Sequence, residues 1–461
     1  MTRHHAVVIG GSFAGLAAAT ALRETFSHVT VIDRDDVPTA GRAPRRGVPQ
    51  SAHVHGIRML GRRVMEELLP GFVERTLDCG AELFDVLALG ASLTPHGWRA
   101  RGKSRAEGFG IRRSLLEEVM RTRVLAHDNV TFVQGQAMDL VDVGEGAERR
   151  IGGAMVRDAE RTYRLDADLV VDAAGRGSPA PRWLEKLGFP YPEDDVVNGF
   201  VGYASRWLKV PERAWPGDFR FVSQMPWPGQ TKGATLYPQD NGLHILTLYG
   251  QSKDFPAGDE AGWVAFMRGC ATPLFYEVWS RSEPVTEIRT SRSTANRWRH
   301  YSRVPEPPAG FLAVGDAVAS FNPIFGQGVT CAVLAGRLLR TMLQDTDDNL
   351  CDLPRRFNTR LAEMLVEPWQ TAVGFDLNFP ATTGTRPVLT EEETRQREHK
   401  SLLARLSTID LEVAETMHIA EQMFEPEALS TPDMTQRVKA FAAAGCHLPA
   451  WDPARPPALV A

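Results

Sequence analysis

The sequence is short of lysine and of net charge, and both shortages limit what the protein can bind. Only 7 of its 52 basic residues are lysine, a bias typical of GC-rich bacterial coding sequences. The formal net charge is −5 over 461 residues. A field this weak argues against nucleic acid as the main partner, because phosphate backbones are bound by concentrated basic patches.

Cysteines and long apolar runs are also scarce. The five cysteines lie far apart without a C-x-x-C pair, which fits neither a disulfide framework nor a zinc site. No apolar run approaches the roughly 20 residues that a membrane-spanning helix needs. The N-terminus leads straight into a predicted strand and leaves no room for a signal peptide. These absences predict a soluble, cytoplasmic protein with free thiols.

The most informative stretch is the first 33 residues. An apolar strand over 5–9 meets the turn Gly10–Gly15, a small-residue helix covers 16–22, and a second apolar run ends at Asp33. This is the spacing of a dinucleotide-binding βαβ unit. Gly10 permits the tight turn, and Gly15 lets the helix approach the strand closely. The helix N-terminus would face a pyrophosphate, and Asp33 would accept hydrogen bonds from ribose hydroxyls.

One residue departs from the G-x-G-x-x-G pattern, because Ser12 stands at the central glycine. Serine is small enough for a phosphate to approach the backbone, so we interpret the turn as a variant of the fingerprint. The fingerprint alone leaves FAD and NAD open as the cofactor.

The rest of the chain predicts an α/β protein with a second sheet. Short strands over 130–133 and 137–143 precede a hairpin and the buried strand 168–172, so a small β-meander is inserted into the nucleotide-type sheet. Four alternating, aromatic-rich strands follow within 200–250 and indicate an antiparallel sheet. The apolar strand at 311–314 then returns to the first pattern.

We therefore predict four segments. Residues 1–190 and 296–345 form a discontinuous Rossmann-type FAD-binding domain, residues 191–295 form an antiparallel-sheet substrate domain, and residues 346–461 form a helical region.

Four local predictions concern residues 82–126. The alternating run 82–93 predicts one strand, and the basic stretch 99–107 predicts an exposed loop. Ser114 and Glu117 have the spacing of a capping box at the start of a helix. Arg112, next to them, is expected to be solvated.

Three distant segments together resemble a known family. The turn Gly10–Gly15 with Asp33, the strand Asp168–Gly175, and Gly315-Asp316 with its glycine-rich helix look like the FAD-dependent monooxygenases of the para-hydroxybenzoate hydroxylase fold. Two local forms, PQSAHVH at 49–55 and NPIFGQG at 322–328, resemble the bacterial polyether polyketide epoxidases, which are distantly related to squalene epoxidase.

The resemblance implies roles for individual residues. Asp316 would accept hydrogen bonds from the FAD ribityl hydroxyls, Arg113 would contact the phosphate and ribose region, and Gly326 and Gly328 would lie at the N1–C2 edge of the flavin. The predicted cofactor-binding residues are Gly10, Ser12, Phe13, Ala14, Gly15, Asp33, Arg34, Gln50, His53, Arg113, Asp172, Gly175, Asp316, Pro323, Gly326, Gln327 and Gly328.

Other candidate residues remain open between a site role and a structural one. Trp227, Tyr237 and Tyr249 are candidates for an apolar substrate wall, although sheet core explains each equally well. The pair His53 and His55 has a metal-ligand form, but no third ligand has suitable spacing, so we predict no metal. No catalytic residue is named.

The implied activity is epoxidation in bacterial secondary metabolism, such as polyketide antibiotic biosynthesis. Oxygen from a flavin C4a-hydroperoxide would pass to a carbon–carbon double bond of a large apolar substrate in a dry pocket. With no second Rossmann fingerprint, NADPH or NADH would dock transiently at the flavin or act through a separate reductase. The alternatives are aromatic hydroxylation and an FAD-containing cyclase without net oxidation. A halogenase is disfavoured, because its W-x-W-x-I-P motif is absent.

Overall fold

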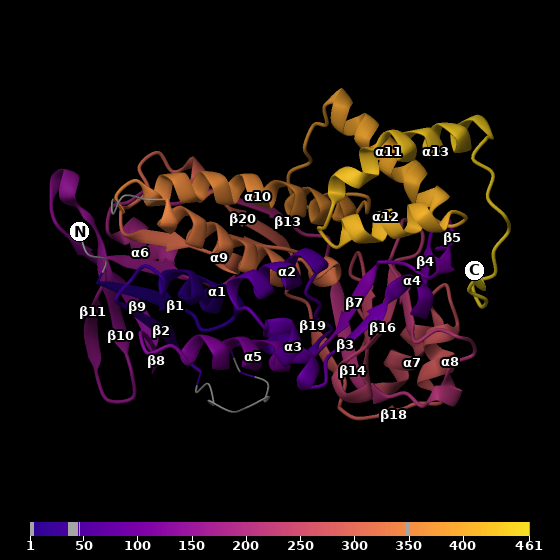
Figure 1. Cartoon of the computed structure of the whole chain (residues 1–461), viewed down its shortest axis with the longest axis horizontal. Coiled ribbons are helices and arrows are strands. Elements are labelled where there is room, and N and C mark those ends of the chain that lie inside the picture. The colour runs from indigo at the N-terminus through magenta and orange to yellow at the C-terminus, as the bar shows by residue number, and fades with distance from the viewer. Residues whose placement is uncertain (1–3, 36–44, 46, 346–349, 461) are drawn as a thin grey trace.

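The computed structural model describes residues 4–35, 45, 47–345 and 350–460 (Figure 1). Its first layer is a five-stranded parallel sheet in the order β21-β12-β1-β2-β8. Four of the strands are apolar and largely buried, as expected for a parallel sheet covered on both faces, whereas the edge strand β8 is partly exposed. They are β1 (His5–Ile9), β2 (His28–Asp33), β8 (Val130–Gln134), β12 (Leu169–Asp172) and β21 (Phe311–Ala313). The fifth strand comes from beyond residue 300, which confirms that this sheet is discontinuous in sequence.

Helices pack closely on the parallel sheet. Helix α1 (Phe13–Leu22) contacts β1 and β2 and lies against the long helix α9 (Gly328–Gln344). A Cβ placed on Gly336 would lie 2.6 Å from that of Ala17, so small residues set the spacing of the two helices. The other helices of this part are α2 (Met59–Leu68), α3 (Phe72–Asp78), α5 (Arg113–Leu125) and α6 (Ala180–Lys186).

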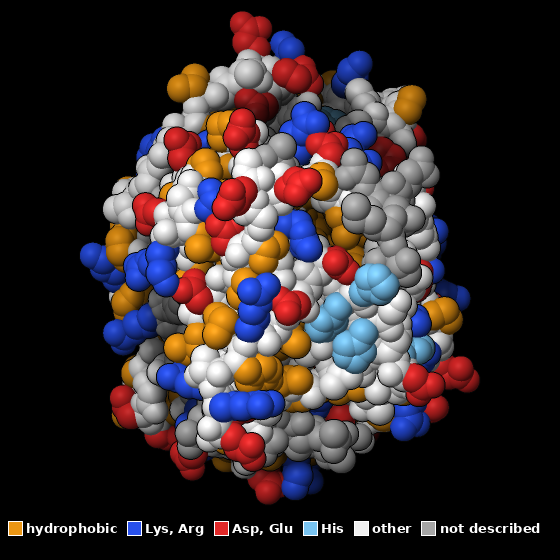
Figure 2. All heavy atoms as spheres, turned by 90° about the vertical axis from the view of Figure 1, so that its left-hand side faces the viewer, with side chains coloured by type: hydrophobic (Ala, Val, Ile, Leu, Met, Phe, Trp, Pro, Cys, Tyr) orange, Lys and Arg blue, Asp and Glu red, His pale blue; other side chains and the backbone are white. Residues whose placement is uncertain are grey.

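The predicted meander is present beside this sheet. Its antiparallel strands are β9 (Gln136–Val143), β10 (Arg150–Arg157) and β11 (Thr162–Asp166). Figure 2 views the molecule from this end and shows positive and negative side chains interspersed over the surface. On this face, therefore, no extended patch carries a single sign of charge.

The second layer is an eight-stranded mixed sheet at the lower right of Figure 1. Its strands are β4 (Gly90–Thr94), β5 (Gly97–Trp98), β14 (Gly202–Lys209), β15 (Phe221–Gln224), β16 (Lys232–Pro238), β17 (Leu243–Gly250), β18 (Glu283–Pro284) and β19 (Arg289–Ser291). One face carries an apolar core that includes α7 (Glu260–Arg268) and α8 (Leu274–Trp279). The four predicted strands are confirmed, because side chains of alternating polarity suit a sheet with one apolar face.

Three smaller sheets connect these parts. Strand β13 (Asp194–Val197) pairs with β20 (Asn296–Arg299), which pairs with β22 (Ala319–Ser320). Strand β3 (Glu82–Asp85) pairs with β7 (Glu107–Gly110). Strand β6 (Arg101–Gly102) pairs with β23 (Leu459–Val460) near the C-terminus.

Two of the local predictions are wrong. The run 82–93 is not one strand, since Asp85 accepts hydrogen bonds from the backbone N–H groups of Leu87 and Ala88 and caps the short helix α4 (Val86–Leu89). The stretch 99–107 is not a uniformly exposed loop. Arg101 is 2% exposed, and its guanidinium donates to the Gly90 carbonyl at 2.8 Å and to Asp218 at 2.8 Å. Arg101 is buried because residues distant in sequence bind its guanidinium, whereas composition alone predicted that it is exposed.

The C-terminal helices are α10 (Leu353–Asp376), α11 (Glu391–Leu406), α12 (Leu411–Glu421) and α13 (Pro432–Ala443). The last three helices share a small apolar core of their own, and α12 lies above α4 and β16 in Figure 1. Within the described ranges, no helix is both long and apolar enough to cross a membrane. The predicted domain boundaries at residues 190, 295 and 345 stay predictions.

Candidate functional site

The turn between β1 and α1 has a backbone that only glycine can supply. Gly10 has a φ of +110°, and a Cβ there would lie 2.4 Å from the Ala173 carbonyl oxygen. A Cβ on Gly15 would lie 1.7 Å from the Gly10 carbonyl oxygen. The chain therefore turns tightly and brings the N-terminus of α1 against the sheet, as the fingerprint requires.

Ser12 does more than replace a glycine of similar size. It is the residue before α1, and its hydroxyl donates to Glu117 Oε2 at 2.8 Å. The same hydroxyl accepts a hydrogen bond from Arg113 Nη2 at 2.9 Å. The serine thus ties the phosphate-type turn to helix α5, which a glycine could not do.

Charged side chains around this turn are paired with one another. Asp33 Oδ2 accepts hydrogen bonds from the Gly11 N–H at 2.8 Å and from Arg45 Nη1 at 3.1 Å. Arg45 Nη2 lies 2.6 Å from Glu117 Oε1. Burial opposes the charge of Arg45, but the Glu117 and Asp33 carboxylates outweigh it and raise the pKa. Arg45 was missed from sequence, since no local motif marks it.

Arg113 lies between the two predicted halves of the site. It is 7% exposed, its guanidinium stacks 4.6 Å from the Phe13 ring centroid, and Glu117 lies 3.5 Å away. Burial lowers the pKa of Arg113, against the opposing charges of Glu117 and Asp316. The predicted capping box is wrong, because helix α5 begins at Arg113 and Glu117 turns inward to the arginines.

Arg112 was expected to be solvated, and this expectation is wrong. Its Nε donates to Asp240 Oδ2 at 2.7 Å, and its guanidinium lies 5.3 Å from the Trp207 ring centroid. Asp240 is fully buried, so it needs this partner.

Asp316 lies directly beside the first half of the site. A Cβ on Gly315 would be 2.6 Å from that of Ala14 in α1, so the two segments are in contact. Burial raises the pKa of Asp316, although Arg113 and Arg176 pull it down. No group in the described part of the chain donates a hydrogen bond to this carboxylate, which leaves its oxygens available to a ligand.

The segment Asn322–Gly328 forms a second turn at this edge. Gly326 has a φ of +60°, and Gly328 is the first residue of the 17-residue helix α9. Gln327 is 6% exposed, and its Oε1 has no hydrogen-bond donor among the described residues. Pro323 is exposed at the start of the turn. A helix N-terminus and an unsatisfied amide oxygen therefore face the same region.

A buried carboxylate from α10 holds this second turn. Asp376 accepts hydrogen bonds from the side-chain amides of Asn322 at 2.9 Å, Asn296 at 2.7 Å and Gln251 at 2.9 Å. Burial raises the pKa of Asp376, and the three amides oppose that shift. Asp376 and these three partners come from four separate segments of the chain, so sequence reasoning could not find them.

The segment Gln50–His55 runs from this region to the second sheet. His53 is 5% exposed, and its Nδ1 lies 2.9 Å from the Ser205 hydroxyl. Burial lowers the pKa of His53 to about 4, so the ring is neutral at pH 7. His55 Nδ1 donates to the His53 carbonyl at 3.0 Å, and burial together with Arg113 lowers its pKa to about 3. Among the described residues, no group of three or more potential ligands could hold a metal.

The remaining predicted residues divide between the site and the scaffold. Asp172 is buried and accepts hydrogen bonds from the Ala174 N–H and the Ser178 hydroxyl, so both of its oxygens serve the turn. Gly175 has a φ of +80° and open space around it. Gln50 is half-buried and Arg34 is exposed.

The three candidate wall residues are not brought together. Trp227 packs against the apolar core beside α7 and α8. Tyr237 lies on the opposite face, with ring centroids 5.1 Å from Phe221 and 5.4 Å from Phe84. Tyr249 lies on that face too, but its hydroxyl is engaged by its own sheet through the Gln224 and Ala234 carbonyls.

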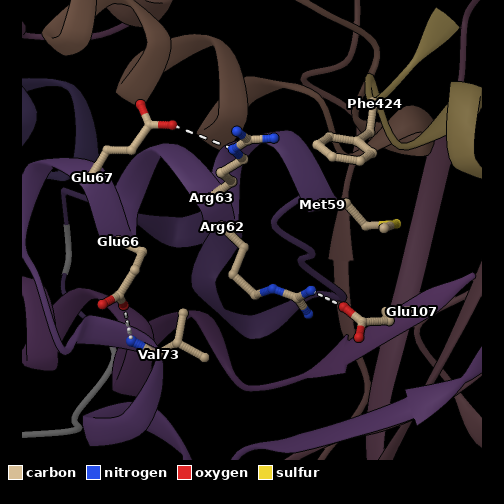
Figure 3. A pocket seen from close by; sticks show the side chains of 8 residues that line it. All are labelled: Met59, Arg62, Arg63, Glu66, Glu67, Val73, Glu107 and Phe424. Atoms are coloured by element: carbon tan, nitrogen blue, oxygen red, sulfur yellow. Dashed lines mark hydrogen bonds and ion pairs between the residues drawn. The ribbon is translucent and has the colours of Figure 1, made fainter. Parts of the chain in front are cut away.

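A separate pocket of about 520 Å³ lies against the outer side of α2 (Figure 3). Figure 3 shows Arg62 pointing to Glu107 and Arg63 pointing to Glu67. Arg63 also lies 5.7 Å from the Phe424 ring centroid. Because these charges are paired with one another, the pocket is not where the unpartnered groups meet.

The groups around the two turns fit a dinucleotide that has a pyrophosphate at one part and uncharged hydroxyl donors at another. The first turn offers a helix N-terminus with two arginines, which suits a pyrophosphate. Asp316 offers a carboxylate to neutral hydroxyl donors, and the start of α9 favours negative charge on a ring edge. FAD has these groups in this order, so the residues present fit FAD.

Solved structures with a similar fold include a flavoprotein and a flavin-dependent halogenase. A flavoprotein/dehydrogenase from Cytophaga hutchinsonii matches with a TM-score of 0.62 and 14% identity over 95% of this chain and 98% of that chain. The flavin-dependent halogenase CmlS matches with a TM-score of 0.62 and 17% identity, and the match covers 95% of this chain and 78% of that chain. A 2-methyl-3-hydroxypyridine-5-carboxylic acid oxygenase matches with a TM-score of 0.57 and 18% identity, and the match covers 82% of this chain and 92% of that chain. The fold is that of flavin-dependent oxygenases and halogenases.

Two sequence comparisons complete this placement. A family model described as an NAD(P)-binding Rossmann-like domain matches residues 8–84. Protein Rv3254 of Mycobacterium tuberculosis is 32% identical over 398 residues, which cover 83% of this chain and 82% of that protein. The chain belongs to the family of protein Rv3254.

Proposed function

We propose that the chain is an FAD-dependent monooxygenase. The observation that carries the proposal is Asp316, a largely buried carboxylate without a hydrogen-bond donor in the described chain, held against the first turn of α1. This carboxylate lies within electrostatic range of Arg113 and Arg176 but accepts no hydrogen bond within the described chain, so neutral donors from a ligand can satisfy it. The ribityl hydroxyls of FAD would supply them.

Each side chain around the cofactor then has a distinct task. Arg45 and Arg113 bind the pyrophosphate, and Asp33 accepts from the ribose. The start of α9 stabilises negative charge at the flavin edge, and Gln327 Oε1 accepts a hydrogen bond from a donor of the cofactor. When bound, FAD supplies the activation of dioxygen and the delivery of one oxygen atom. NADPH or NADH would supply the electrons, directly or through a reductase.

Within this class we propose transfer of oxygen to a carbon–carbon double bond of a large, mainly apolar substrate. The resemblance of residues 49–55 and 322–328 to polyketide epoxidases supports it. His53 is held neutral by burial, so the segment beside the proposed flavin carries no acid at pH 7. Epoxidation suits such a site, since it needs orientation and exclusion of water more than proton transfer.

Hydroxylation of a phenol is the second candidate, and Arg58 favours it. Its guanidinium lies near Gly326, with Nε 3.9 Å from where a Cβ would sit there. The Nε is buried without an acceptor, and no carboxylate in the described chain forms an ion pair with Arg58. A cation in this position would stabilise the phenolate that such a reaction uses.

The test uses FAD-loaded protein, NADPH, a flavin reductase and oxygen-18 gas. Squalene serves as the alkene probe and 1,8-dihydroxyanthraquinone as the phenol probe, with product masses read by mass spectrometry. One heavy oxygen atom in squalene supports epoxidation, and one in the anthraquinone supports the second candidate. Recovery of all consumed oxygen as hydrogen peroxide with both probes contradicts a monooxygenase.

A further inference from the structure

A row of hydroxyl side chains crosses five strands of the large sheet at one register. Ser205 of β14 pairs with Thr247 of β17, which pairs with Thr235 of β16. Thr235 pairs with Ser223 of β15, which pairs with Ser92 of β4. Side chains at paired positions point to the same face of a sheet. This hydroxyl row therefore lies opposite the apolar core that covers the other face.

The two ends of the hydroxyl row differ. At one end Ser205 and Thr247 are 1% and 2% exposed, their hydroxyls are 2.7 Å apart, and His53 closes the chain at 2.9 Å from Ser205. At the other end Thr235, Ser223 and Ser92 keep partial exposure. The Ser223 hydroxyl donates to that of Ser92 at 3.0 Å, and the Thr235 hydroxyl lies 2.9 Å from that of Tyr249. The second end is thus open to a ligand that can exchange hydrogen bonds.

An apolar row runs beside the hydroxyl row on the same face. Trp207 and Tyr237 both pair with Ile245, and the ring centroids of Tyr237 and Phe221 lie 5.1 Å apart at 82°. Aromatic side chains offer flat apolar surface to a conjugated ligand. This face of the sheet therefore carries the hydroxyl row and, parallel to it, a row of aromatic and apolar side chains.

Arg58 is an independent sign of a ligand at this face. It lies within electrostatic range of the Tyr237 hydroxyl and of Glu421 in α12, yet no ion pair neutralises it in the described chain. A half-buried guanidinium that forms no ion pair of its own can pair with the charge of an anionic ligand. Its position beside Gly326 places that charge at the junction of the proposed flavin site and the sheet.

We infer that this face binds an acidic, oxygen-bearing conjugated molecule, whose carboxylate pairs with Arg58 and whose other oxygens bond along Thr235, Ser223 and Ser92. The inference rests on the proposed function, because the hydroxyl row begins at His53 beside the proposed flavin. It narrows the substrate from a large apolar molecule to one with oxygens along one edge.

The experiment measures binding of three probes to FAD-loaded protein by isothermal titration calorimetry. The probes are 4,5-dihydroxyanthraquinone-2-carboxylate, anthracene-2-carboxylate, which lacks the oxygens, and 1,8-dihydroxyanthraquinone, which lacks the charge. We expect the first probe to bind at least about 10-fold more tightly than either of the others, since each feature adds hydrogen bonds to a charged or hydroxyl partner.

Variants separate the two features. Arg58→Gln should weaken both carboxylates by about 10-fold or more and leave 1,8-dihydroxyanthraquinone unchanged, whereas Arg58→Lys should retain the preference for carboxylates. Ser223→Ala with Thr235→Val should weaken only the two hydroxylated probes. Arg63→Gln is the matched control, because Arg63 lies in α2, the helix that directly follows Arg58, and its side chain is 64% exposed.

Equal binding of the three probes, or binding of none, overturns the inference. So does an Arg58→Gln variant that loses all probes equally. FAD content is measured on the same samples, so a protein that holds no FAD contradicts the proposed function itself. A protein that holds FAD but does not rank the probes contradicts only the substrate class.

Discussion

The two halves of the proposed FAD site differ in how their polar groups are satisfied. In the half next to the first turn, Asp33, Arg45, Glu117 and Arg113 are bonded to one another or to Ser12. In the other half, the Gln327 Oε1 and the Arg58 Nε have no such partner within the described residues, and no group among these residues donates a hydrogen bond to the Asp316 carboxylate.

The difference shows how each half would respond to a ligand. In the first half, the Glu117 carboxylate pairs with Arg45 and Arg113, the arginines that would bind the pyrophosphate. A bound pyrophosphate would therefore have to replace Glu117 as their partner. In the second half, the unpartnered groups can form hydrogen bonds or ion pairs with a ligand without breaking contacts within the protein. Substitutions in the first half should therefore change the stability of the FAD-free protein, and those in the second should change FAD affinity.

The largest effect is expected from Glu117→Gln. Arg45 and Arg113 would lose their shared carboxylate, which should lower the free energy of unfolding of the FAD-free protein by about 3–5 kcal/mol. With FAD bound the loss should be smaller, because the pyrophosphate compensates the arginines. Urea denaturation with and without FAD measures both values. Glu391→Gln, whose side chain is 95% exposed, is the control. An equal loss of unfolding free energy with and without FAD would contradict the proposed difference between the two halves of the site.

Asp316→Ala should show the reverse pattern. Loss of charge-assisted hydrogen bonds to FAD should weaken its affinity by about 3 kcal/mol, or roughly 100-fold. The FAD-free protein should not lose stability, since the carboxylate has no donor there and its desolvation is removed. Fluorescence quenching of FAD measures the affinity, and urea denaturation measures the stability. A large loss of stability without FAD would show that Asp316 is a structural residue.

Acid should test the buried histidine between the second half and the large sheet. Burial lowers the pKa of His53 from 6.5 to about 4, so the unfolded chain takes up this proton first as pH falls. The free energy of unfolding should therefore decrease between pH 6.5 and pH 4, with a contribution of up to about 1.4 kcal/mol per pH unit. His53→Asn should reduce this slope, and His4→Asn, at an exposed histidine, should not. An unchanged slope in His53→Asn would contradict the assignment.

The smallest effect is expected from Ser12→Gly, which restores the usual glycine. The hydroxyl bonds to Glu117 and Arg113 would be lost, at a cost to stability of about 1 kcal/mol. Ser12→Ala should lose a similar amount if the hydroxyl, and not backbone flexibility, is responsible. Thermal unfolding of both variants makes this comparison, and a more stable Ser12→Gly protein would contradict it.

Local patterns predicted the scaffold well. The turn Gly10–Gly15 and the strands around it follow from glycine placement and apolar runs, and the alternating residues of β14 to β17 follow from the period of a strand. The sequence did not predict Glu117, which fits a capping box by spacing but turns inward to Arg45 from a distant loop. Arg112 likewise finds Asp240 through the fold.

The candidate site depended even more on long-range geometry. Asp316 and Gly326 were predicted because a family pattern marks them. The hydroxyl row and Arg58 carry no motif, since they arise from the register of five strands and from a guanidinium left unpaired in three dimensions. Such features become visible only when the pairing of strands is known.

The most direct test of the central claim is titration of FAD into the FAD-free protein, followed by fluorescence. One FAD should bind per chain, and the free energy of unfolding should rise with FAD concentration. Asp316→Ala should lose most of this binding. Absence of binding, or binding that Asp316→Ala leaves unchanged, would contradict the account.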